Sequence, residues 1–143
     1  MTLSPQIRDR VQDSFARQGM MATLGARLVD LGPGLCRIAA PITPAVSQQH
    51  GFAHAGLAFA LGDSAAGYAA LTLMPPGAEV LTVEMKINLL RPAAGVDLVA
   101  SGQVLRAGAR LTVVRAEVQA RAGDGTERLV AVLQGTMIPA DAG

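Results

Sequence analysis

The sequence has little of several residue types, and each shortage excludes a class of protein. A single cysteine, Cys36, rules out a disulfide within the chain and fits a reducing compartment. Aromatic residues make up only 3% of the chain, so the core must be aliphatic. The net charge is +1 without a basic run, which gives no electrostatic case for nucleic acid. The N-terminus lacks the apolar block of a signal peptide, so we expect a cytoplasmic protein.

The dominant feature that is present is a long apolar run that starts at His50 and ends before Pro75 and Pro76. Since proline cannot continue a helix, this run predicts a helix over about 54–73. A helix without a polar face is either buried or spans a membrane. Its glycines and a central Asp63 argue against a membrane span. We therefore expect a buried helix whose many small residues let neighbouring backbone approach closely.

The remaining pattern predicts a single α+β domain over 1–143. A first helix over about 4–18 is indicated by Ser4-Pro5 and by an apolar residue at every fourth position. Strands are predicted at 27–31, 35–42, 79–91, 96–106, 111–121 and 127–138. Alternation within 79–91 puts Thr82 on the polar side of that strand, with Glu84 and Lys86. The last strand, 127–138, is a nearly continuous apolar run, which predicts burial on both of its faces. Short connections between the late strands predict antiparallel pairing, in one sheet curled around the long helix.

The start of the long helix is a candidate binding site. His54, Ala55 and Gly56 form its first turn, where backbone N–H groups have no partner within the helix. Together with the helix dipole, these groups suit an oxyanion or a polarised carbonyl oxygen. Gly51 and Gly56 would allow close approach by a ligand. An ordinary loop-to-helix entry is the alternative interpretation.

Asp63 is the second candidate, because a lone carboxylate in an apolar helix must be paired, neutralised or functional. The alternatives are a structural hydrogen bond to a neighbouring strand, or an exposed patch on the helix. Gly56 and Asp63 would lie roughly 10 Å apart along the helix axis, too far for one small reacting group. If both serve one site, the carboxylate must come from a second copy. A two-fold dimer with antiparallel long helices would provide two such sites.

Other polar residues have weaker signals. The residues before the long helix could orient a carbonyl or a water: Gln48, Gln49 and His50. Thr82 could hold a water. His50 and His54 have no third metal-ligating residue nearby, so we expect no metal. Ser64 lacks the G-x-S-x-G pattern of a nucleophile.

Taken together, these motifs resemble the hotdog-fold acyl-CoA thioesterases of the PaaI-like branch. That family shows an Asn, a Gly, then His-Gly-Gly and Leu-x-Asp-x-Ala on the long helix. The corresponding positions here are Gln48, Gly51, 54–56 and 61–65, and the strand 81–92 is also similar. Two departures stand out: Gln48 replaces the Asn, and Ala55 replaces the first glycine of the pair.

The resemblance implies a hotdog fold and hydrolysis of acyl-CoA thioesters. The carbonyl would sit against the N–H groups of Ala55 and Gly56, with Asp63 of the partner subunit as general base or as nucleophile. Supporting roles would fall to Gln48 (positioning the carbonyl or water), His54 (bracing the turn) and Thr82 (holding the water).

The resemblance also implies how the substrate and subunits are arranged. The apolar helix surface and dimer seam would take the acyl chain. Residues expected beside the substrate are Gly51 and Ser64, with Arg91, Arg106 and Arg110 as candidates for the CoA phosphates. No metal or redox cofactor is implied, and family members are commonly dimers of dimers.

Two other functions remain open. Hydratases and dehydratases of acyl thioesters share the fold, but they usually place a catalytic His against a carboxylate and carry other motifs. A non-catalytic acyl-CoA sensor is the alternative from a different class. Asp63 distinguishes the two classes, since a pure binder does not need a carboxylate in an apolar helix.

Overall fold

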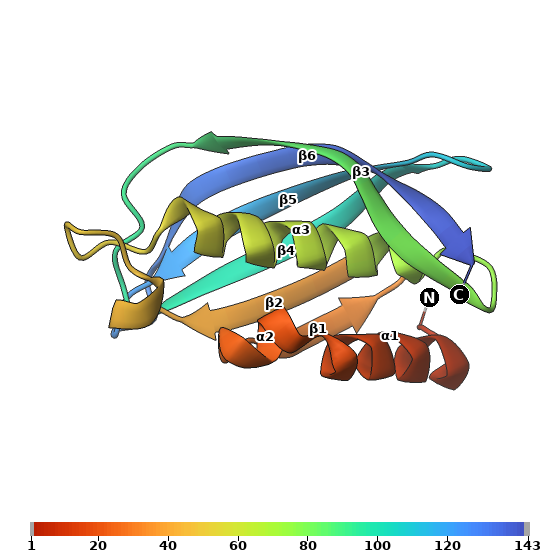
Figure 1. Ribbon diagram of the computed structural model, residues 1–143, viewed down its shortest axis with the longest axis horizontal. Helices are drawn as coiled ribbons and strands as arrows, with labels where there is room; N and C mark the ends of the chain where they lie inside the picture. The colour runs from red at the N-terminus through yellow and green to blue at the C-terminus, as the bar shows by residue number, and fades with distance from the viewer. Residues whose placement is uncertain (1, 142–143) are drawn as a thin grey trace.

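The computed structural model describes residues 2–141, which form one antiparallel sheet wrapped around a central helix (Figure 1). The central helix, α3, spans Ala55–Leu71, and two helices precede the sheet: α1 (Pro5–Arg17) and α2 (Gly19–Thr23). The strands of the sheet are β1 (Arg27–Gly32), β2 (Leu35–Pro41), β3 (Ala78–Leu89), β4 (Asp97–Ala107), β5 (Thr112–Arg121) and β6 (Glu127–Asp141). A 3-10 turn, η1 (Pro44–Val46), lies between β2 and α3. The predicted α+β architecture is confirmed.

The order of strands is β1-β2-β4-β5-β6-β3, so β3 forms one edge of the sheet. β3 pairs with β6 rather than with β4, although β4 follows it in the chain. The connection 90–96 therefore crosses from the edge to the middle of the sheet. It passes the start of α3, where the Ala53 N–H donates to the Ala93 carbonyl at 2.9 Å. This crossing creates one wall of the site described below.

The small residues of α3 allow the sheet to approach it closely, as predicted. Most of the helix is buried, with Leu61, Ala65 and Ala66 at 0% exposure. The tightest approach is at Gly102 of β4, where an added Cβ would lie 2.3 Å from the Ala65 carbonyl carbon. Only a glycine fits there, because any side chain would overlap the helix backbone.

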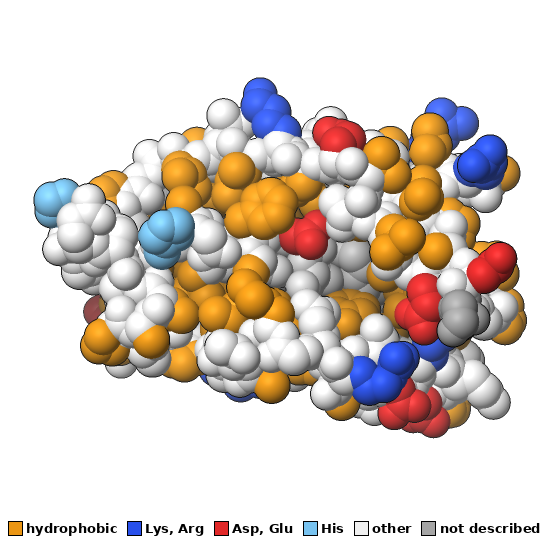
Figure 2. Space-filling model, viewed as in Figure 1, with side chains coloured by type: hydrophobic (Ala, Val, Ile, Leu, Met, Phe, Trp, Pro, Cys, Tyr) orange, Lys and Arg blue, Asp and Glu red, His pale blue; other side chains and the backbone are white. Residues whose placement is uncertain are grey.

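The sheet leaves one stripe of α3 uncovered. Ala55, Gly56 and Phe59 are exposed, and Ala60 and Asp63 are partly exposed. These positions recur every three to four residues, which places them on one face of the helix. On this side of the molecule hydrophobic side chains gather over α3, with an acidic side chain in their midst (Figure 2).

A β-bulge in β3 overturns the predicted placement of Thr82. The register with β6 shifts between Thr82 and Glu84, so Val83 is an extra residue. Without the bulge, Thr82 and Glu84 would share a face. With it, Thr82 lies on the helix side of the sheet, whereas Glu84 bonds Thr136 on the outer side.

The prediction that the last strand is buried on both faces is wrong. On β6, Ala131, Leu133 and Met137 face α3 and are at most 2% exposed. On the outer face Val132 is half-buried and Gln134 is exposed. The apolar residues on the outer face of β6 are partly shielded by the neighbouring strands β5 and β3. Among the residues that the structure describes, no second layer of structure covers them.

α1 packs alongside α3 and caps its end. Arg10 donates to the carbonyls of Leu71 (2.6 Å), Met74 (3.1 Å) and Pro75 (2.6 Å). Leu71 is the last residue of α3, and a cation at this end interacts favourably with the helix dipole. Among the helices described in 2–141, none is long and apolar enough to cross a membrane.

Candidate functional site

The first turn of α3 presents a backbone donor that has no partner among residues 2–141. His54 is the N-cap residue, and its Nδ1 accepts a hydrogen bond from the Gly56 N–H at 2.8 Å. The Leu57 N–H donates to the His54 carbonyl at 2.9 Å. Within residues 2–141, the Ala55 N–H has no hydrogen-bond partner. Of the two amides predicted to meet a carbonyl oxygen, Ala55 is therefore the one available.

The loop before α3 is held in place by backbone hydrogen bonds. The Gln48 N–H donates to the Phe52 carbonyl at 2.8 Å, and the Gly51 N–H donates to the Gln48 carbonyl at 3.1 Å. Gly51 has a φ of +85°, which favours glycine, so its role is to close this turn. The Gln48 side-chain oxygen accepts from the His50 N–H. The amide nitrogen of Gln48 has no partner among the residues that the structure describes, so it can donate to a ligand.

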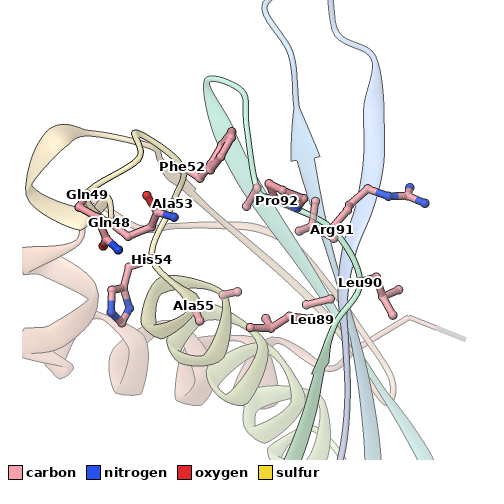
Figure 3. A pocket seen from close by; sticks show the side chains of 14 residues that line it. Gln48, Gln49, Phe52, Ala53, His54, Ala55, Leu89, Leu90, Arg91 and Pro92 are labelled. Atoms are coloured by element: carbon pink, nitrogen blue, oxygen red, sulfur yellow. The ribbon is translucent and has the colours of Figure 1, made fainter.

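A pocket of about 600 Å³ opens beside the Ala55 amide. Gln48, His54 and Ala55 line one side of it, and Leu89 and the connection to β4 line the other (Figure 3). Most of the lining is apolar, with additional residues that the sequence patterns did not identify: Phe52, Leu90, Pro92, Ala93, Val130 and Ala131. No local motif marks these residues, because the crossing connection assembles them. The pocket therefore offers an apolar channel that leads to a backbone donor.

Asp63 lies in a different cavity. It is partly buried, and its Oδ1 accepts a hydrogen bond from the Thr82 hydroxyl at 2.7 Å. The Thr82 hydroxyl also lies 3.2 Å from the Met137 sulfur. Asp63, Ser64 and Thr82 share a cavity of about 140 Å³. The bulge at Val83 is what turns Thr82 towards this carboxylate.

The two parts of the predicted site are thus separated within one chain. Ala55 lines the larger pocket and Asp63 the smaller one. Eight residues of helix put them about 12 Å apart along the axis. Both lie on the stripe of α3 that the sheet leaves uncovered, so a second copy placed against that stripe would have access to both.

The candidate arginines lie at two ends of the molecule. Arg91 lines the larger pocket, but its guanidinium extends away from the other labelled side chains (Figure 3). Arg106 and Arg110 belong to the β4–β5 hairpin. That hairpin is near the C-terminal end of α3, since Val104 and the α3 cap Thr72 both bond Gly34. The structure does not bring these three side chains together in one chain.

The Cys36 thiol is unsuited to act as a nucleophile. Burial, and to a lesser extent the nearby Asp30 carboxylate, raises the pKa of the Cys36 thiol to about 12, so it stays protonated. Cys36 is 1% exposed. Among residues 2–141, no group of three or more His, Cys, Asp or Glu side chains is placed to hold a metal ion.

Comparisons with known proteins show which family the chain belongs to. The family model described as the thioesterase superfamily matches residues 50–126. A protein of Halobacterium salinarum named "Putative esterase" is 30% identical over 113 residues, which is 76% of this chain and 74% of its own. A thioesterase family protein from Silicibacter pomeroyi is 45% identical, with a TM-score of 0.92 and coverage of 95% and 99% of the two chains.

The PaaI protein of the E. coli phenylacetic acid degradation operon has a TM-score of 0.84 over 97% of this chain and 96% of its own. Its identity is 23%, so this likeness concerns the fold. The chain belongs to the thioesterase superfamily, and its fold is the hotdog fold. Family membership indicates a hydrolase that acts on thioesters.

Proposed function

We propose that the protein hydrolyses acyl-CoA thioesters at a site shared by two copies of the chain. The Ala55 N–H of one copy donates a hydrogen bond to the thioester carbonyl oxygen, and Asp63 of the other copy attacks the carbonyl carbon or activates water. The observation that carries the proposal is the separation of these two groups into different cavities on one uncovered stripe. The Ala55 amide lines one cavity and the Asp63 carboxylate lines the other, so one thioester carbonyl does not reach both groups of the same chain.

Two routes conserve atoms and charge. As a general base, Asp63 takes a proton from water while the water oxygen attacks the carbonyl carbon, and the proton then passes to the departing CoA sulfur. As a nucleophile, Asp63 forms a mixed anhydride as the thiolate leaves, and water then hydrolyses the anhydride. In both routes the negative charge that develops on the carbonyl oxygen is stabilised by the Ala55 N–H.

Several contacts support the remaining roles. His54 holds the helix start by bonding the Gly56 N–H, which fixes the direction of the Ala55 N–H. The Thr82 hydroxyl, bonded to Asp63, is within reach of a water on the same carboxylate. Gln48 lines the larger pocket, and its amide nitrogen is suited to bind the carbonyl or the water.

A dimer is needed for this site. The uncovered stripe of α3 lies next to β3, an edge strand whose exposed side chains include Leu81 (55%), Val83 (56%) and Leu89 (57%). An unpaired apolar edge of this kind favours association. With antiparallel helices, the β4–β5 hairpin of the second copy comes to the end of the molecule that holds the larger pocket. Arg106 and Arg110 of that copy then join Arg91 as candidates for the CoA phosphates.

The test is release of free thiol from a panel of acyl-CoAs that differ in chain length, charge and aryl content. Wild type is compared with Asp63→Asn, and we expect a loss of at least ~10²-fold in the variant. Light scattering on dilution accompanies the assay. Binding of acyl-CoA without turnover by a folded dimer would instead favour a sensor, and an active monomer would contradict the shared site.

A further inference from the structure

The cavity beside Asp63 has a polar wall that the hydrolysis of a thioester does not itself require. Gln18, at the junction of α1 and α2, reaches across to α3. Its Nε2 donates to the Tyr68 hydroxyl at 2.9 Å, and its Oε1 accepts from the Ser64 hydroxyl at 3.2 Å. The other side of the cavity is apolar, formed by Val80 and Met137. Gln18 lies outside residues 50–126, the segment that the family model matches.

Two hydrogen bonds hold the amide of Gln18 in place and leave part of its hydrogen-bonding capacity unused. Tyr68 is only 4% exposed, and its hydroxyl also lies 3.2 Å from the Ser14 hydroxyl. A glutamine amide has two N–H donors and two acceptor lone pairs. Within residues 2–141, one donor and one acceptor of Gln18 are used. The cavity wall therefore offers a fixed N–H donor next to a fixed carbonyl acceptor.

The size and charge of the cavity limit what it can hold. Its volume is about 140 Å³. A protein cavity of about 150 Å³ takes up benzene, so roughly six non-hydrogen atoms fit. The Asp63 carboxylate at the cavity repels an anionic group. The remaining polar lining is uncharged, which suits a hydroxyl or carbonyl oxygen.

We propose that this cavity is the acyl subsite, and that Gln18 makes it select short acyl groups that carry an uncharged hydroxyl or carbonyl oxygen. The inference rests on the proposed function, because the acyl group enters this cavity only if its carbonyl is attacked at Asp63. An unsubstituted acyl chain would cover the Gln18 amide and leave its free donor and acceptor without water. The cost of leaving these two groups without a hydrogen bond corresponds to a preference of about 10-fold or more, in kcat/KM, for the oxygenated acyl chain.

The experiment compares kcat/KM for butanoyl-, 3-hydroxybutanoyl- and 3-oxobutanoyl-CoA, with succinyl-CoA and octanoyl-CoA as charge and length probes. Wild type should prefer both oxygenated substrates over butanoyl-CoA by about 10-fold, and should use the two probes least well. Gln18→Leu should bring the ratios to about one. Gln18→Glu offers only acceptors, so it should keep the preference for the hydroxyl and lose that for the 3-oxo group. Gln6→Leu, the same change at an exposed site on α1, should leave every ratio unchanged.

The outcomes separate this inference from the function on which it rests. No turnover of any acyl-CoA overturns both. Turnover without the oxygen preference, or with a preference that Gln18→Leu does not alter, overturns the subsite alone. Thermal melting checks that each variant is folded. If Gln18→Leu does not fold, Ser64→Ala is the deciding variant. It removes a hydrogen bond to the Gln18 amide, which can then rotate, so the kcat/KM ratios of oxygenated substrates to butanoyl-CoA should fall several-fold. Unchanged ratios would contradict the proposal.

Discussion

Replacing Ala55 with proline tests the oxyanion donor without disturbing the helix. Proline lacks a backbone N–H, so Ala55→Pro deletes an amide that has no partner within residues 2–141. The position tolerates the change, because Ala55 is the first residue of α3 and proline is favoured there. The preceding residue, His54, has φ −63° and ψ 143°, the extended conformation that a residue before proline prefers. The variant should therefore fold with unchanged or slightly higher stability.

The size of the effect follows from the engagement of the neighbouring backbone amide, that of Gly56. The Gly56 N–H is bonded to His54 at 2.8 Å, so it cannot take over the carbonyl oxygen without loss of the cap. Removal of one oxyanion donor typically lowers kcat by about 10²–10³-fold, or ~2.7–4 kcal/mol. Ala55→Gly keeps the N–H and is the matched control, for which we expect activity within several-fold of wild type.

The assay is release of CoA thiol, followed with a thiol reagent. Cys36, the only cysteine, is buried and protonated, so the protein contributes little background. Thermal melting of both variants shows whether α3 is intact. If Ala55→Pro were folded and retained wild-type kcat, the carbonyl would not be bound by this amide, and the proposed oxyanion site would be wrong.

Four further predictions follow from single contacts. Thr82→Val should lower kcat about 10-fold by removing the hydroxyl bonded to Asp63, whereas Thr82→Ser should retain activity in the same assay. His54→Ala should lower the unfolding free energy by about 1 kcal/mol in urea melts, and His54→Asn should restore the cap. Gly102→Ala should cost about 1–3 kcal/mol or more in the same melts, since its Cβ overlaps α3. Burial would raise the pKa of Asp97, but hydrogen bonds from two arginines outweigh it and lower that pKa below 3.8. The ionised Asp97 carboxylate therefore stabilises the folded protein above pH 3.8, and this stabilisation is lost as pH falls through the lower pKa of the folded state. Asp97→Asn should therefore make the unfolding free energy depend less steeply on pH at acidic pH.

The elements of the fold were predictable from the sequence because their ends carry local signals. Ser4 and Pro5 start α1, and Pro75 stops the run that contains α3. The many small residues of α3 predicted that neighbouring backbone would approach the helix closely. In the structure, the backbone of the sheet does so at Gly102. Local backbone chemistry acts within a few residues, so it is visible without knowledge of the fold.

The features that depend on pairing between distant strands were not predictable. The bulge at Val83 reverses the face on which Thr82 lies, and simple alternation cannot reveal an extra residue. The place of β3 beside β6 was not predicted, so the pocket walls at Phe52 and Leu89 were missed. Gln18 has no motif at all, since its contact with α3 exists only when α1 docks.

The most direct test of the shared site mixes two inactive variants. Asp63→Asn keeps the Ala55 donor, and Ala55→Pro keeps the carboxylate, so a mixed dimer has one intact site and one site with both defects. After the subunits are exchanged at equal amounts, half of the dimers are mixed, and about a quarter of wild-type activity should return. If the donor and the carboxylate of the same chain formed the site, mixing would restore no activity, and a site shared between two subunits would be excluded.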